Sequence, residues 1–130
     1  LVARAGVLLS EVQYIKETPF KRFAILNTGM HHLLRPALYE AYHRILPVLV
    51  EEREKRGKNN KVYDVVGPIC ESADVLGRDR LLPVLNEGDK LAIMDVGAYG
   101  AVMSSAYNSH ESPNEWVYWQ GKEYRSQSSP

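Results

Sequence analysis

The chain has 130 residues, of which 45% are hydrophobic and 25% are charged, and its 16 basic and 16 acidic side chains cancel. This composition predicts one globular domain, and the zero net charge argues against a nucleic-acid-binding surface, which would concentrate lysine and arginine. No apolar run approaches the ~20 residues that span a bilayer. The single cysteine cannot form an internal disulfide, so the cytoplasm, or a plastid stroma, is the expected compartment.

Short β-type runs separated by turn residues dominate the chain. The first predicted strand runs from Leu1 to Tyr14, buried at its start and half exposed at its end. The later strands share β-branched and aromatic enrichment and are expected at residues 22–26, 43–50, 61–66, 90–94, 115–119 and 122–125. Helical pattern is weaker and is confined to residues 35–44, 49–56 and 98–105. This spacing predicts a mostly β barrel or sandwich with a few short helices.

Two polar features carry no functional prediction. The charged stretch from Glu51 to Lys61 mixes both signs around glycine and asparagine, so we expect a solvated loop there. The four histidines have no partner at the spacing of a zinc site, and ordinary polar or core roles are expected for them.

Three positions offer chemistry. Arg35, before Pro36, is either a surface side chain at a helix start or a guanidinium fork for a carboxylate. Tyr99, between two glycines, is either a packed turn aromatic or a phenol presented to a ligand. Cys70 is either a small buried hydrophobe or a ligand-site thiol. Because the neighbouring Glu71 disfavours the thiolate, Cys70 suits a proton donor or a packing group better than a nucleophile.

Four segments together resemble the C-terminal domain of the diaminopimelate decarboxylase family. They are AGVLLSEV (5–12), NTGMHHLLRPALYEAYH (27–43), VVGPICESADVLGRDR (65–80) and GDKLAIMDVGAYGAVMSSAYN (88–108). Members of this family combine a (β/α)8 barrel, which carries pyridoxal phosphate on a lysine, with a β domain similar to that of alanine racemase. The resemblance implies that residues 1–130 form one such β domain, with the barrel and its lysine absent from this chain.

The resemblance also implies roles for five residues. Cys70 and Glu71 would reach across a homodimer interface into the partner's active site, where Cys70 is catalytic and Glu71 meets the distal ammonium of the substrate. Arg35 and Tyr39 would contact the distal carboxylate of the substrate. Tyr99 would lie in the substrate site and against the cofactor, near its phosphate.

The implied activity of the full-length protein is pyridoxal-phosphate-dependent conversion of meso-2,6-diaminopimelate to L-lysine and CO2. The isolated chain is expected to be inactive, because the resemblance places the cofactor lysine in the barrel. The chain departs from the family pattern in three places: Asn27 replaces an aspartate, His31 replaces an asparagine, and the stretch YNSHESPNEW (107–116) loses two arginines at His110 and its neighbours.

Two alternatives remain at this point. An ornithine- or arginine-type decarboxylase would share the fold, although such enzymes usually carry Cys-Asp rather than Cys-Glu and lack the stretch RPALY. A free-standing β domain that acts as an interaction module would need no cofactor.

Overall fold

The computed structural model describes residues 1–48 and 59–126 and has the predicted mostly β fold. Its strands are β1 (Val7–Glu17), β2 (Arg22–Leu26), β3 (Ile45–Pro47), β4 (Asn60–Val66), β5 (Val75–Pro83), β6 (Lys90–Met94), β7 (Trp116–Trp119) and β8 (Lys122–Arg125). Its helices are α1 (Arg35–Tyr39) and the short 3-10 helices η1 (Val2–Ala5), η3 (Ala101–Met103) and η4 (Tyr107–Ser109). None of the helices in the described part is long and apolar enough to cross a membrane.

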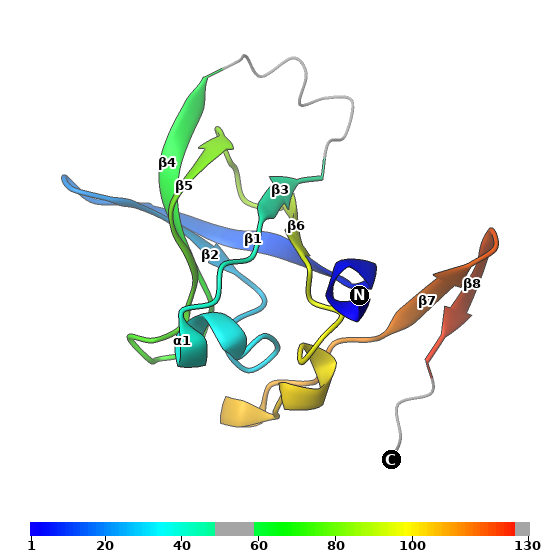
Figure 1. Ribbon diagram of the computed structural model, residues 1–130. Coiled ribbons are helices and arrows are strands. Elements are labelled where there is room, and N and C mark those ends of the chain that lie inside the picture. The colour runs from blue at the N-terminus through cyan, green and yellow to red at the C-terminus, as the bar shows by residue number, and fades with distance from the viewer. Residues whose placement is uncertain (49–58, 127–130) are drawn as a thin grey trace.

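Six strands form one curved sheet in the order β3-β6-β1-β2-β4-β5 (Figure 1). The pair β2–β4 is parallel and the other pairs are antiparallel. The sheet curls until its two outer strands, β3 and β5, approach each other, which makes it nearly a closed barrel. The connection from β2 to β4 is long enough for a parallel pair, because it includes α1 and β3.

The long strand β1 joins the two halves of this sheet. Its first half pairs with β6, from Val7 opposite Met94, and its second half pairs with β2. A bulge between Val12 and Tyr14 shifts the register at the point where the partner changes. Such a bulge bends a strand and increases its twist, so β1 can turn from one neighbour to the other and help to close the barrel.

The core lies on the inner face of the curved sheet. On β6, Leu91 and Ile93 are fully buried while Lys90 is exposed, which is the alternation expected of a strand with one covered face. Ala24 and Leu26 on β2 bury the same face in the same way.

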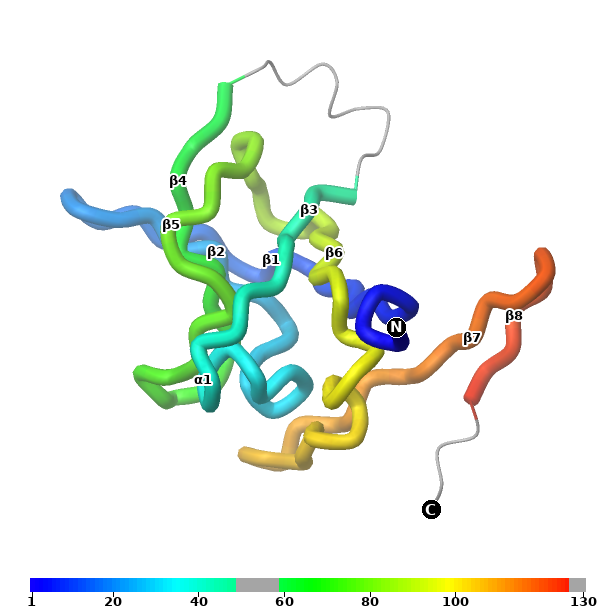
Figure 2. The backbone as a smooth tube through the Cα atoms, viewed as in Figure 1, coloured from blue at the N-terminus to red at the C-terminus, as the bar shows by residue number. Residues whose placement is uncertain are grey.

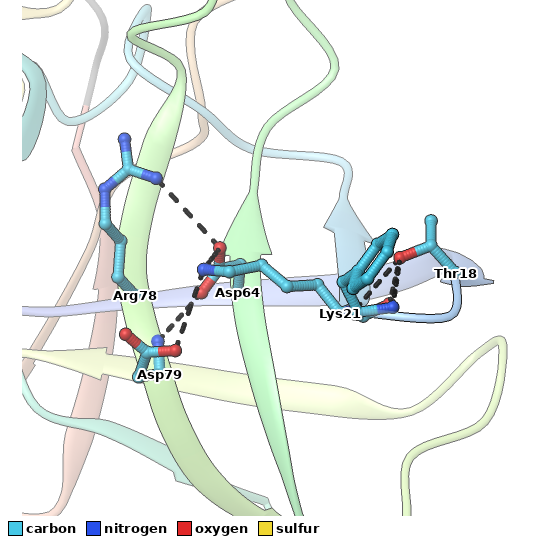
Figure 3. Close-up of polar contacts among 6 residues, drawn as sticks. Thr18, Lys21, Asp64, Arg78 and Asp79 are labelled. Carbon is cyan, nitrogen blue, oxygen red and sulfur yellow. Dashed lines mark hydrogen bonds and ion pairs between the residues drawn. The ribbon is translucent and has the colours of Figure 1, made fainter.

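A buried carboxylate connects three strands on one side of the sheet (Figure 3). Asp64 on β4 is 3% exposed; it accepts a hydrogen bond of 2.7 Å from Lys21, next to β2, and one of 2.8 Å from the backbone N–H of Asp79 on β5. Arg78 lies 4.0 Å from the same carboxylate. Burial alone would raise the pKa of Asp64, but the hydrogen bonds from Lys21 and Asp79 hold it below its ordinary value.

The hairpin β7–β8 lies outside this sheet. Both strands form where they were predicted, yet every side chain in them is exposed, including Trp116 and Trp119. The hairpin projects away from the six-stranded sheet, as the ribbon and the tube show from the same side (Figure 1, Figure 2). Its strands are therefore stabilised by their own pairing and not by burial in the core.

Several predicted boundaries are wrong. The first strand begins at Val7 rather than Leu1, because hydrogen bonds to the turn after β6, such as Gly97 N–H to Ala3 carbonyl at 3.0 Å, hold residues 2–5 in a 3-10 helix. The helix predicted at 35–44 ends at Tyr39, because Glu40 adopts a left-handed φ of 55°.

The last predicted helix, 98–105, is reduced to a 3-10 turn at Ala101–Met103, and strand β5 was not predicted at all. The strand predicted at 43–50 forms at Ile45–Pro47. The helix predicted at 49–56 and residues 51–58 of the charged stretch lie outside the described residues, and Lys61 lies on β4.

Candidate functional site

The segments that carry the predicted site residues meet at one end of the barrel. Helix α1 contacts β5, and the loop 67–74 connects β4 to β5. The segment 97–110, which follows β6, lies at the same end, along the lower edge of Figure 1 and Figure 2. Residues far apart in the sequence are thereby brought to one edge of the fold.

The loop 67–74 takes its shape from the buried carboxylate of Asp74. This side chain is 3% exposed and accepts hydrogen bonds from the backbone N–H groups of Met30, at 2.6 Å, and Ile69, at 2.8 Å. The backbone of the same residue accepts from Gly67 N–H and donates to Glu71 carbonyl, each at 3.0 Å. One aspartate thus closes the loop on itself and ties it to the segment before α1.

Two glycines make room for this carboxylate. A Cβ on Gly29 would lie 2.5 Å from an oxygen of Asp74, and a Cβ on Gly67 would collide with the same carboxylate. Burial raises the pKa of Asp74, and the hydrogen bonds from Met30 and Ile69 oppose this rise without cancelling it. Sequence analysis missed Asp74, because strand β5, which follows it directly, was not predicted either.

Cys70 and Glu71 project from this anchored loop and are both exposed. The phenol of Tyr107 donates a hydrogen bond of 2.6 Å to Glu71 Oε1. This hydrogen bond and the negative charge of Glu71 raise the pKa of Tyr107. Tyr107 was not among the predicted site residues, although it lies within one of the four segments that carry the family resemblance.

Arg35 and Tyr99 form a second contact at this end of the barrel. Arg35 is the first residue of α1, and its guanidinium carbon lies 5.9 Å from the centre of the Tyr99 ring, within the outer limit of a cation–π contact. Tyr99 has a left-handed φ of 62° and is 62% exposed. Tyr39, at the other end of α1, is 61% exposed. The structure therefore pairs Arg35 with Tyr99, and Glu71 with Tyr107.

Three histidines form a cluster that sequence analysis did not foresee. His31 is 1% exposed, and its ring centre lies 3.7 Å from that of His32 and 4.6 Å from that of His110. Burial, followed by the charges of the other two histidines, lowers the pKa of His31 to about 4. The sequence signal for this cluster was that His31 and His110 both replace other residues of the family pattern. No group of His, Cys, Asp or Glu in residues 1–48 and 59–126 could hold a metal ion.

A separate open groove of about 800 Å³ lies beside α1, β3 and β5. At its edge the Arg80 guanidinium stacks on the Tyr42 ring, 3.9 Å from its centre. None of the five predicted site residues lines this groove. Cys70, Glu71 and Tyr99 lie instead on exposed loops, and Arg35 and Tyr39 lie at the two ends of α1.

Known proteins match this chain over most of its length. The family described as pyridoxal-dependent decarboxylase, C-terminal sheet domain, matches residues 2–97. A diaminopimelate decarboxylase from Methanocaldococcus jannaschii is 46% identical over 113 residues, which are 87% of this chain and 24% of the relative. The chain thus spans about a quarter of the length of the curated relatives it matches.

Solved structures of diaminopimelate decarboxylases are also similar to this chain. A crystal structure of diaminopimelate decarboxylase from M. jannaschii has a TM-score of 0.86 at 41% identity and covers 95% of this chain and 27% of its own. The Helicobacter pylori diaminopimelate decarboxylase complexed with L-lysine has a TM-score of 0.84 at 42% identity, with 95% and 29% covered. These findings confirm the resemblance that the four segments indicated. The chain belongs to the pyridoxal-dependent decarboxylase family, whose C-terminal sheet domain it forms.

Proposed function

We propose that this chain is the C-terminal domain of a diaminopimelate decarboxylase, which converts meso-2,6-diaminopimelate to L-lysine and CO2 with pyridoxal phosphate. The observation that carries this proposal is the 46–49% identity to relatives named diaminopimelate decarboxylase over 84–87% of the chain. This similarity favours a diaminopimelate decarboxylase over an ornithine or arginine decarboxylase and over a non-catalytic interaction domain.

The charges at this end of the barrel suit the distal end of diaminopimelate. The distal carbon of this substrate carries an ammonium and a carboxylate, so its recognition requires an anion and a cation together. Glu71 supplies the anion, and Arg35 supplies a planar fork that can form two parallel hydrogen bonds with a carboxylate. The exposed phenol of Tyr39, four residues along α1, assists Arg35 with the same carboxylate.

The residues present also fit the cofactor. The exposed phenol of Tyr99, close to the positive Arg35, offers a hydrogen-bond donor to the phosphate of pyridoxal phosphate. When bound, the cofactor supplies an electron sink for the decarboxylation. The thiol of Cys70 would supply the proton that the α-carbon needs after CO2 has left.

The exposed position of Cys70 and Glu71 suits service to a neighbouring subunit. We propose a homodimer in which the anchored loop 67–74 of one subunit enters the active site of the other, while the barrel domain that precedes this domain carries the cofactor lysine. Anchoring by Asp74 would hold the loop in shape before the two subunits meet, which reduces the cost of ordering it in the complex.

Substitution of Arg35 by Met in the full-length enzyme tests the proposed substrate. Because the guanidinium is assigned to the distal carboxylate, kcat/KM for meso-diaminopimelate should fall by ~30-fold or more. L-lysine offered as a substrate in place of diaminopimelate has no distal carboxylate, so its kcat/KM should change by less than about threefold. Steady-state kinetics with each amino acid as substrate measures both quantities.

Arg22→Met is the matched control, because Arg22 is a half-buried arginine on β2, paired with Glu17 at 2.7 Å and away from the site segments. It should leave both constants unchanged. Equal losses for diaminopimelate and lysine in Arg35→Met would show that another group recognises the distal carboxylate. A full-length wild-type protein that does not decarboxylate diaminopimelate would refute the proposed function itself.

A further inference from the structure

The hydrogen bond between Tyr107 and Glu71 joins two segments that are 36 residues apart in the chain. At 2.6 Å, it has the short length of an O–H donor that meets a carboxylate. It occupies Oε1 of Glu71 and leaves Oε2 to another donor. A carboxylate on a surface loop would otherwise rotate among several directions, so this contact restricts where the second oxygen points.

The backbone around Tyr107 is held in an uncommon conformation. The next two residues, Asn108 and Ser109, have left-handed φ values of 56° and 61°. Asn adopts this region readily, but a serine there is strained. Such strain persists where the surrounding contacts determine the chain path, which indicates that both sides of this turn are held in place.

Two histidines hold both sides of the segment. The N–H of Ser105 donates to the His31 carbonyl at 2.8 Å, and Nε2 of His32 lies 2.7 Å from the Glu111 carbonyl. Because a carbonyl can only accept, Nε2 of His32 carries the hydrogen, and Nδ1 accepts from the Thr28 hydroxyl at 2.8 Å when the ring is neutral. The segment that presents Tyr107 is thus fastened before and after that residue.

The loop that presents Glu71 is fastened to the same stretch of chain. Asp74 closes that loop and accepts from the N–H of Met30, which is adjacent to His31. Residues 28–32 therefore form a common base for the donor and for the acceptor of the Tyr107–Glu71 bond. With both partners held on one base, the bond defines a direction for the Glu71 carboxylate relative to the fold.

We infer that Tyr107 is a positioning residue, which orients Glu71 so that Oε2 faces the distal ammonium of the substrate. This inference rests on the proposed function, because it assigns the occupant of Oε2. The hydrogen bond from the phenol also shares the negative charge of Glu71 without neutralising it, so the carboxylate keeps its attraction for a cation. Since the pKa of Tyr107 lies above its ordinary value, the phenol remains a donor at neutral pH.

Tyr107→Phe removes this donor and keeps the ring. In the full-length enzyme it should raise KM for meso-diaminopimelate ~5- to 20-fold and change kcat less than threefold, because orientation of Glu71 contributes to binding. In a Glu71→Gln background the same substitution should add less than about twofold, since the group that it orients is already altered. Tyr14→Phe, on the exposed part of β1, is the matched control and should leave both constants unchanged.

A second measurement does not depend on turnover. In full-length protein labelled with ¹³C at tyrosine Cζ, the Tyr107 signal, identified by its absence in Tyr107→Phe, should titrate above the ordinary tyrosine pKa of about 10. In Glu71→Gln it should return toward that value. If Glu71→Gln returns the pKa of Tyr107 to its ordinary value but the wild-type enzyme does not turn over diaminopimelate, the proposed function is refuted and the Tyr107–Glu71 contact stands. A titration that Glu71→Gln does not alter, or unchanged kinetics in Tyr107→Phe, would overturn the inference.

Discussion

Two aspartates in this domain have the same burial and opposite electrostatic settings. Asp64 and Asp74 are both 3% exposed, and both accept hydrogen bonds from backbone N–H groups of distant segments. Asp64 also pairs with Lys21, and its pKa is lowered. Asp74 forms no ion pair with any residue that the structure describes, and burial raises its pKa.

The electrostatic difference between the two aspartates corresponds to their different structural roles. Asp64 connects strands of the sheet, where a cation can offset the desolvation of the carboxylate. Asp74 instead anchors the loop that carries Cys70 and Glu71, and its charge is stabilised mainly by two N–H donors. The loop is thus held by directional hydrogen bonds, which fix its shape without placing a fixed cation beside the exposed Glu71.

The greatest effect is expected from Asp74→Ala. It leaves the N–H groups of Met30 and Ile69 without their acceptor, and an unsatisfied buried donor costs ~1–3 kcal/mol. Hydrogen exchange measured by mass spectrometry should accelerate ~100-fold for amides in the peptides 28–33 and 67–75. Amides of β6 should exchange as before; acceleration there to the same degree would mean that the whole fold, and not the loop, depends on Asp74.

A smaller effect is expected from Asp64→Ala. Only one backbone donor, Asp79 N–H, loses its acceptor, so exchange in residues 76–80 should accelerate about tenfold in the same measurement. Asp79→Asn is the matched control, since the side chain of Asp79 is 74% exposed and lies 3.7 Å from Lys21, and asparagine tolerates the left-handed φ of 50° at this position. Comparable acceleration in both variants would contradict the central role of the buried carboxylate.

The smallest and most discriminating effect is the direction of pH dependence. The pKa of Asp64 is lowered from 3.8, so its stabilisation is complete above pH 3.8 and is lost as the pH falls through the folded-state value. The pKa of Asp74 is raised from 3.8, so its protonation, as the pH falls through the folded-state value toward 3.8, stabilises the native state.

Asparagine variants convert this contrast into a measurement. As the pH falls from 7 toward 3.8, exchange protection of wild type relative to Asp74→Asn should increase, and as it falls further below 3.8, protection relative to Asp64→Asn should decrease. Comparison of wild type and variant at each pH removes the intrinsic pH dependence of exchange. Slopes of the same sign for both positions would show that the two carboxylates do not differ as described.

Sequence patterns predicted the elements whose signal is local. The strand at residues 22–26 and the hairpin strands near Trp116 and Lys122 form where β-branched and aromatic residues cluster between turn residues. Strand β5 was missed because Gly77, Arg78, Asp79 and Arg80 interrupt its apolar pattern. Asp79 takes a left-handed φ of 50° there, and its N–H bonds to Asp64, a contact that no local window contains.

The candidate site likewise contains some residues that sequence motifs indicated and others that only the structure revealed. Motifs pointed to Arg35, Tyr39, Cys70, Glu71 and Tyr99, because the residue types and their order resemble a known family, and those roles remain predictions. Tyr107 and Asp74 were not foreseen, since their partners lie 36 and 44 residues away and neither forms a spacing pattern.

The sequence by itself determined the mostly β class, the family and the identity of the chemical groups, because each is encoded in composition, alternation or short motifs. Tertiary structure alone decided which of those groups meet. Closure of the barrel brings the loop 67–74, the base formed by residues 28–32 and the segment 105–111 to one end. Hydrogen bonds require that proximity and a defined angle, and only the folded sheet supplies both.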